Sequence, residues 1–153
     1  SMIACHTALF AYNSNKPVKM IYSRSEDMQY TSKRHPSRTF HKSAVNREGK
    51  ILGMDIEFII DAGAYTTLSP VVLSRGAIHA AGPYCIDHIR IKARAMATNN
   101  FPYGAFRGFG APQSIFALER HIDKIAYTLG KTTDEIRRLN FIKRKNLLAQ
   151  LDV

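Results

Sequence analysis

The sequence is poor in several residue types, and each shortage excludes a class of protein. It has 153 residues, no tryptophan and only two cysteines, Cys5 and Cys85, too few for a disulfide framework or a zinc knuckle. The six histidines show no HxxxH or HExxH spacing, so we expect no metal held directly by side chains. No apolar run approaches the roughly 20 residues that a membrane helix needs, and residues 1–15 lack the basic start of a secretory signal. We therefore expect a cytoplasmic protein.

Acidic residues are also scarce, since 12 Asp and Glu stand against 22 Lys and Arg, a formal net charge of +10. Such an excess is typical of small nucleic-acid-binding modules, and also of a piece cut from a larger protein whose other parts carry the acidic residues. Ser1 and Met2 resemble a cloning remnant, and residues 3–12 read as the middle of a helix without an N-cap. We interpret residues 3–153 as a single fragment. Former interfaces left exposed on it would favour self-association.

Hydrophobic periodicity predicts an α+β fold, with helices packed on a mixed or antiparallel sheet that contains a long hairpin. Residues 39–45 and 51–60 form the clearest hairpin, and Gly49 in its turn is expected to need a positive φ. Further strands are expected at residues 18–22 and 86–96. Five helices are expected: one at residues 3–12, one that starts at the N-cap Ser25, one at residues 70–81, one from Pro112 to Gly130, and one from Thr132 to about Asn140.

The connection at residues 97–112 is the most informative segment. Its Gly104, Gly108 and Gly110 would let the backbone approach a ligand closely, and the helix that follows offers unpaired N–H groups at its N-terminus. Arg107 adds a charge with two parallel donors. These features predict an anion cradle, although a tight glycine turn with a solvated Arg107 explains the spacing equally well. The pattern matches neither GxGxxG nor GxxxxGK[ST], so nucleotide binding has no motif support.

Three further side chains are candidates for ligand contacts. Phe106 and Phe109 are either core anchors of the loop or rings that stack on a flat aromatic ligand. Arg75 lies in the apolar segment 70–81, where an arginine more often reaches the surface than faces a cavity. If it faces a cavity, it would orient a carbonyl or an anionic substrate.

Two groups of basic residues are candidates for a nucleic-acid surface: Arg90, Lys92 and Arg94, and the cluster Arg137, Arg138, Lys143, Arg144 and Lys145. A stacking platform would need aromatic residues interleaved with these charges, and the sequence has none there. A solvated or covered face is therefore the favoured interpretation.

The run Ala105-Phe106-Arg107-Gly108-Phe109-Gly110-Ala111-Pro112-Gln113 resembles the signature of the molybdenum hydroxylases, the xanthine dehydrogenase and aldehyde oxidase family. Further segments follow the family pattern in the same order: Lys16-Pro17-Val18, Arg24-Ser25-Glu26-Asp27-Met28, Lys33-Arg34-His35-Pro36, Asp61-Ala62-Gly63-Ala64-Tyr65, Ser74-Arg75-Gly76-Ala77 and Thr98-Asn99. The resemblance covers nearly the whole chain. It implies a part of a larger molybdopterin-binding domain or subunit, with iron–sulfur clusters and FAD on other domains or subunits.

The resemblance also implies residue roles. Members of this family hydroxylate a heterocycle or an aldehyde with oxygen from water. By the family pattern, Arg107 contacts the molybdenum–pterin site, Phe106 and Gly108 lie in the same cofactor loop, and Phe109 packs on the substrate ring. Arg75 matches the arginine that orients a purine, which favours xanthine or hypoxanthine over an aldehyde or another N-heterocycle.

The glutamate general base of the family has no counterpart in these segments, so the resemblance places no catalytic residue in this chain. Later segments that wrap the pterin are also missing. We therefore expect the fragment alone to be inactive and to hold the cofactor poorly, because general-base catalysis is typically worth about 10²–10⁴-fold.

Overall fold

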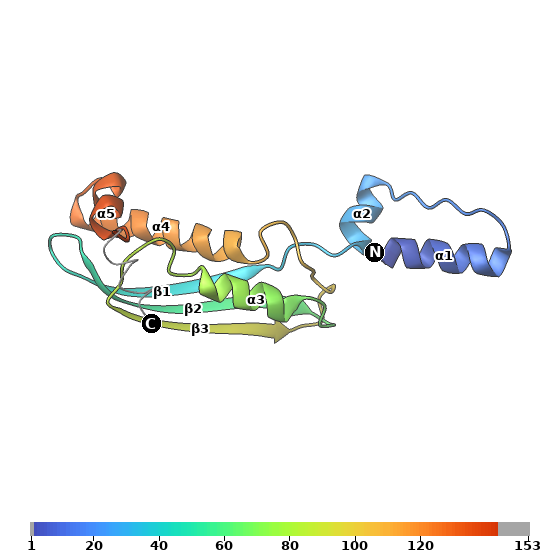
Figure 1. The fold of residues 1–153 in the computed structure, drawn as a ribbon, viewed down its shortest axis with the longest axis horizontal. Coiled ribbons are helices and arrows are strands. Elements are labelled where there is room, and N and C mark those ends of the chain that lie inside the picture. The colour runs from blue at the N-terminus through green and yellow to red at the C-terminus, as the bar shows by residue number, and fades with distance from the viewer. Residues whose placement is uncertain (1, 144–153) are drawn as a thin grey trace. The chain divides into compact units, whose positions relative to one another are not determined.

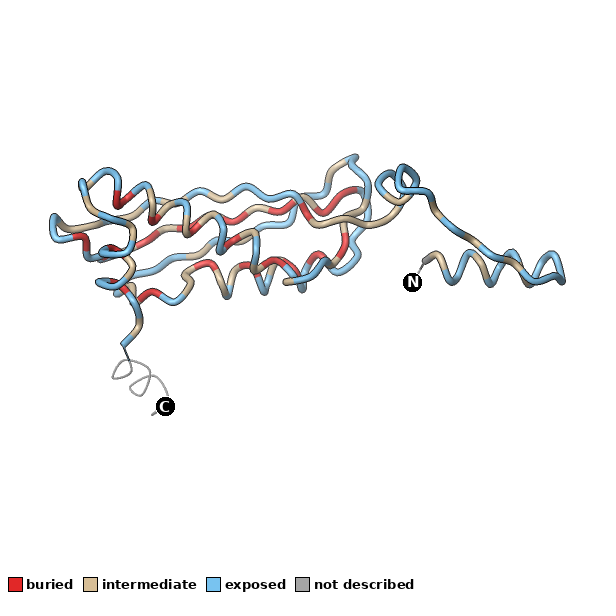
Figure 2. The backbone as a smooth tube through the Cα atoms, turned by 90° about the horizontal axis from the view of Figure 1, so that it is seen from above, coloured by how far each residue is buried: buried red, intermediate tan, exposed pale blue. Residues whose placement is uncertain are grey.

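A computed structural model of the chain describes residues 2–143, and the chain forms two compact units that divide between Thr31 and Ser32. The first unit contains α1 (Met2–Ser14) and α2 (Arg24–Tyr30). Helix α1 confirms the predicted helix, but its apolar side chains are not enclosed: Leu9 and Phe10 are 58% and 53% exposed. Figure 2 shows this unit without a buried segment.

Two expectations for the first unit are wrong. The N-cap of α2 is Ser23, not Ser25. The side chains of Ser23 and Glu26 each accept the other residue's backbone N–H in a capping box, whereas the residue three positions after Ser25 is Met28, which has no carboxylate to complete such a box. Residues 18–22 form no strand, although their composition favours one. No strand among residues 2–143 pairs with them, and an extended segment becomes a strand only through such pairing.

The second unit is built on a three-stranded sheet in the order β1 (Ser37–Val45), β2 (Ile51–Gly63), β3 (His88–Ala97). Strands β1 and β2 form the predicted hairpin, and Gly49 in its turn has a φ of 98°. Strand β3 runs parallel to β2, because α3 (Ser69–Ile78) carries the chain back between them. The sheet is therefore mixed, as expected for an α+β fold (Figure 1).

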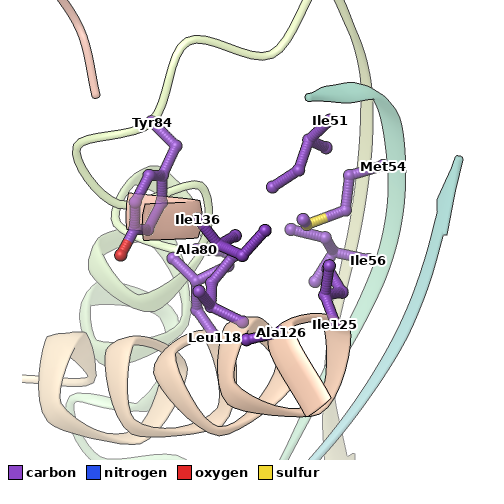
Figure 3. Close-up of a cluster of buried hydrophobic side chains, with 10 residues drawn as sticks. Ile51, Met54, Ile56, Ala80, Tyr84, Leu118, Ile125, Ala126 and Ile136 are labelled. Carbon is purple, nitrogen blue, oxygen red and sulfur yellow. The ribbon is translucent and has the colours of Figure 1, made fainter. Parts of the chain in front are cut away.

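Helices α3 and α4 (Ala111–Leu129) cover one face of the sheet. Alternate residues of β2 point into this layer and are buried, which is why the strand reads with a period of two. The larger core cluster joins β2 to α4 and to α5 (Thr133–Asn140), as Figure 3 shows: Ile51, Met54, Ile56, Ala80, Tyr84, Leu118, Ile122, Ile125, Ala126 and Ile136. A smaller cluster joins Phe58 and Ile60 of β2 to Val72 of α3.

The helix ends confirm the local sequence signals. Helix α4 ends at Gly130, whose φ is 65°, and Thr132 and Glu135 form the predicted capping box of α5. The last residue of α5, Asn140, is buried, and its side chain accepts the Ile51 N–H at 2.8 Å and donates to the Gly49 carbonyl at 2.9 Å.

Among the described residues, no helix is both long and apolar enough to cross a membrane.

Candidate functional site

The loop of residues 98–110 connects β3 to α4, and its first half is tied to the end of β2. The Thr98 N–H donates to the Gly63 carbonyl at 3.2 Å. The Asp61 carboxylate accepts hydrogen bonds from the Thr98 hydroxyl and the Asn100 amide, each at 2.6 Å, and from the Gly63 N–H. Burial acts to raise the pKa of Asp61, but these hydrogen bonds lower it below its ordinary value. The loop therefore starts from a fixed stretch of backbone.

Its second half, residues 106–110, makes a tight turn in left-handed backbone. The φ angles are 93° at Gly108, 47° at Phe109 and 95° at Gly110. The Phe109 N–H donates to the Phe106 carbonyl at 2.8 Å. A residue other than glycine in this region costs on the order of 1–3 kcal/mol, and such strain concentrates at functional sites. The turn is thus the first structural indication of a binding site.

The turn packs directly on α3. A Cβ added to Gly110 would lie 2.1 Å from the Val72 carbonyl oxygen and 3.1 Å from the Gly76 nitrogen. Gly76 follows Arg75 in the chain, so the turn that carries Arg107 and the helix that carries Arg75 meet at this contact. The structure therefore joins two elements, distant in the sequence, that each carry one candidate residue.

The chain itself fills the space where a side chain would lie at two of the loop glycines. A Cβ at Gly104 would lie 2.8 Å from the Cβ of Ser32, and one at Gly108 would lie 2.4 Å from the Cγ of Pro112. At these two positions glycine permits close contacts within the chain on the side where a Cβ would lie.

The expected donors at the N-terminus of α4 are also not free. The Ala111 N–H donates to the Gly108 carbonyl, Pro112 has no N–H, and the N–H groups of Gln113 and Ser114 both donate to the Gly110 carbonyl.

The free backbone donors lie earlier, in the turn of residues 106–110. Within residues 2–143, the N–H groups of Arg107 and Gly108 find no acceptor. The exposed Arg107 guanidinium has no acidic partner in the same part of the chain. A cation and two adjacent N–H groups therefore remain available to an anion.

Arg34 holds this turn from the side, a contact that sequence reasoning did not identify. Its Nη2 donates to the Arg107 carbonyl at 2.7 Å, its Nη1 donates to Gln113 Oε1 at 3.3 Å, and its guanidinium carbon lies 4.9 Å from the centre of the Phe106 ring. The only signal in the sequence was the resemblance of the segment 33–36 to the family pattern.

His35, next to Arg34, is buried beneath the site. Its Nε2 is hydrogen-bonded to Ser69 Oγ at 2.8 Å, and its carbonyl accepts the Gln113 side-chain amide at 3.3 Å. Burial lowers the pKa of His35, and the nearby Gly104 backbone and the Asp61 charge oppose this without reversing it. His35 therefore links the start of α3, through its ring, to the first turn of α4, through its backbone carbonyl.

Arg75 lies on the outer side of α3 and is exposed. It lines an open hollow of about 410 Å³ together with Pro70, Val71, Ser74, Ile78 and His79. Val71 and Ile78 are 51% and 74% exposed, so the hollow is an apolar shelf with one guanidinium beside it. This arrangement suits a flat ligand that carries a polar edge.

The basic groups considered for nucleic acid are largely neutralised inside the chain. Arg90 pairs with Asp55, Arg94 with Glu57, Arg137 with Glu119 and Asp123, and Arg138 with Asp134. Arg144 and Lys145 lie outside the described residues. Residues 2–143 also contain no group of three or more His, Cys, Asp or Glu residues that could hold a metal ion.

Comparison with known proteins shows the family of this chain. A family model described as "Molybdopterin cofactor-binding domain" matches residues 1–141. The nicotinate dehydrogenase large molybdopterin subunit of Eubacterium barkeri is 39% identical over 90% of this chain and 32% of its own length. A Bacillus subtilis protein that is named a probable xanthine dehydrogenase component is 42% identical over 93% of this chain and 19% of its own length.

Among solved structures, the aldehyde oxidoreductase of Desulfovibrio desulfuricans superposes with a TM-score of 0.81 at 35% identity, over 87% of this chain and 15% of that protein. The chain thus spans no more than 32% of the length of these relatives. The fold is that of part of a larger molybdopterin-binding domain. This chain belongs to the molybdopterin cofactor-binding domain family.

Proposed function

We propose that this chain forms one wall of the cofactor and substrate site in a molybdenum hydroxylase that oxidises a nitrogen heterocycle, with a purine such as xanthine or hypoxanthine as the first choice. One observation carries the proposal: the turn that bears Arg107, whose guanidinium has no acidic partner among residues 2–143, packs through Gly110 against the helix that bears Arg75. The two elements that carry the candidate cofactor group and the candidate substrate group are thereby in contact.

The residues of the turn fit a phosphate-bearing pterin cofactor. Arg107 offers a guanidinium fork, and the N–H groups of Arg107 and Gly108 are free to donate to phosphate or carbonyl oxygens. Phe106 and Phe109, which are 51% and 37% exposed, offer apolar surface beside these donors. When bound, the molybdenum cofactor supplies the two-electron oxidation and the transfer of oxygen from water.

Within such a site this chain binds and orients, and moves no proton. Arg107 and its turn would hold the cofactor through the guanidinium and the N–H groups of Arg107 and Gly108. Phe109 stacks on the substrate ring, where aromatic contact is worth roughly 0.5–1.5 kcal/mol beyond burial. Arg75 directs its guanidinium at a carbonyl oxygen of the substrate and stabilises negative charge that develops there. The general base comes from outside this chain, so the chain alone is inactive.

The choice of a heterocycle rests on the Arg75 shelf and on the names of the relatives. Nicotinate and xanthine enzymes are among the similar proteins, and both names denote ring substrates with polar edges. An aldehyde is the alternative within the family, because an aldehyde oxidoreductase shares the fold at 35% identity. A nucleic-acid module is the alternative from another class, and the internal pairing of its basic groups weakens it.

The test uses the full-length protein that carries this chain. Its molybdenum is measured by elemental analysis, and turnover of xanthine, hypoxanthine, nicotinate and a simple aldehyde is measured with an artificial electron acceptor. We expect about one molybdenum per chain and preferred turnover of a heterocycle. Molybdenum with turnover of the aldehyde alone would overturn the substrate assignment. A protein without molybdenum, from a host that makes the cofactor, would overturn the function.

A further inference from the structure

Arg34 makes three contacts at once, two with the turn of residues 106–110 and one with the first turn of α4. It donates to the Arg107 carbonyl at 2.7 Å and to the Gln113 side chain at 3.3 Å, and its charge lies 4.9 Å from the Phe106 ring centre. A planar guanidinium can make these contacts together because its donors form a rigid fork and its face stacks on an aromatic ring. The compact ammonium of a lysine could replace only one of them.

The segment that carries Arg34 is itself braced. The Gly104 N–H donates to the Lys33 carbonyl at 3.0 Å. The carbonyl of His35 accepts the Gln113 amide, and the buried ring of His35 bonds Ser69 at the start of α3. Arg34 therefore reaches the turn from a fixed position.

The hydrogen bond to the Arg107 carbonyl determines where the next N–H points. The Arg107 carbonyl and the Gly108 N–H belong to one planar trans peptide unit, in which the two groups point in opposite directions. Because Arg34 holds the carbonyl on its own side, the Gly108 N–H is directed away from Arg34. That N–H has no acceptor within residues 2–143.

We propose that Arg34 is a positioning residue of the cofactor site: by holding the Arg107–Gly108 peptide, it aims the Gly108 N–H and the Arg107 side chain at the anionic cofactor. This inference rests on the function proposed above. Arg34 touches the turn from behind and does not itself contact the cofactor.

Arg38 provides a matched control. Its guanidinium lies 5.4 Å from the ring centre of Phe40, close to the separation between Arg34 and Phe106, but it makes no hydrogen bond to the turn in the described chain. Arg34→Met and Arg38→Met therefore each remove one charge and one cation–π contact, and only the former releases the Arg107 carbonyl.

The first measurement is hydrogen exchange of the peptides covering residues 104–112 in the full-length protein. Arg34→Met should exchange the turn amides about tenfold faster than the unchanged protein, because local opening becomes easier, and Arg38→Met should leave them unchanged. Equal exchange in both variants would overturn the inference while leaving the proposed function untouched.

The second measurement is molybdenum per chain, taken with the midpoint of thermal unfolding. We expect Arg34→Met to retain at least about fivefold less molybdenum than Arg38→Met, at midpoints within about 3 °C of each other, and Arg34→Lys to regain part of the loss. Faster exchange with full molybdenum would mean that Arg34 orders the turn without serving the cofactor, which also overturns the inference. A lack of molybdenum in the unchanged protein would instead overturn the proposed function.

Discussion

Gly110 lies directly against the carbonyl group of Val72, so that a Cβ on Gly110 would be 2.1 Å from the Val72 oxygen. This contact joins the turn that carries Arg107 to the helix that carries Arg75. Any side chain at position 110 must separate the two, and the site depends on their remaining together.

Gly110→Ala should therefore be strongly destabilising. The position combines a φ of 95° with a collision against backbone, so we expect a loss on the order of 3–4 kcal/mol in the free energy of unfolding. Gly130→Ala is the control, because Gly130 has a φ of 65° but nothing within 4 Å of its added Cβ. It should lose only about 1 kcal/mol. Equal losses in urea titrations would mean that only the backbone angle matters at Gly110.

A buried amide fixes the hairpin to α5. Asn140→Ala removes the partner of the Ile51 N–H, and the Gly49 carbonyl loses a donor as well. Leaving such buried groups unpaired costs on the order of 2–4 kcal/mol of stability. Asn99→Ala, at an exposed position, should change the free energy of unfolding by less than about 0.5 kcal/mol. Chemical denaturation measures both, and a mild effect of Asn140→Ala would show that water replaces the amide.

Stability should fall in mild acid through a stacked histidine pair. The rings of His41 and His121 lie 4.8 Å apart at 16°. Burial, and then the neighbouring His121, lower the pKa of His41 from 6.5 to about 4, and burial followed by the charge of Lys124 lowers that of His121. Because the folded-state pKa is depressed, the unfolded chain takes up protons first. Stability is thus complete above pH 6.5 and falls as the pH approaches 4.

We expect the free energy of unfolding to decrease by on the order of 2 kcal/mol between pH 7 and pH 4.5. His41→Phe keeps a ring in place and removes the titrating group, so its pH dependence should be shallower. Urea titrations at several pH values measure the slope. An identical slope in the variant would assign the acid sensitivity to other groups, such as the buried His35.

Local patterns made most of the fold predictable from the sequence. The end of α4 at Gly130 and the capping box of Thr132 and Glu135 depend on residues within a few positions of each other. The same rule applied to Ser23 and Glu26 identifies Ser23, and not Ser25, as the N-cap of α2. The strand predicted at residues 18–22 was wrong for a different reason, since a strand forms only with a pairing partner, and composition does not reveal that partner.

The site was predictable only residue by residue. Arg107 and Arg75 could be singled out from their surroundings, but no spacing rule indicates that the turn and the helix that carry them meet at Gly110. Arg34 contacts Arg107 and Gln113 from more than seventy positions away. The loop glycines could be noticed in the sequence, but the sequence does not reveal that the chain itself fills the space where side chains would lie at Gly104 and Gly108.

We expect Arg75 to separate the substrate classes. In the full-length protein, Arg75→Met should lower kcat/KM for a purine by about 10²-fold, since a charged hydrogen bond to the ring is lost. Turnover of a simple aldehyde should change by less than about threefold, because it offers no second carbonyl to Arg75. Steady-state kinetics on both substrates decides the matter, and equal losses would assign Arg75 a structural role.

The claim that Arg107 and its turn hold the molybdopterin cofactor is tested most directly by measuring molybdenum and pterin per chain in Arg107→Met of the full-length protein. Arg47→Met, at an exposed position in the turn between β1 and β2, is the control. We expect the Arg107 variant to lose at least about tenfold in bound cofactor, as the loss of a charged donor implies, while the Arg47 variant matches the unchanged protein. Full cofactor content in both variants would contradict the claim.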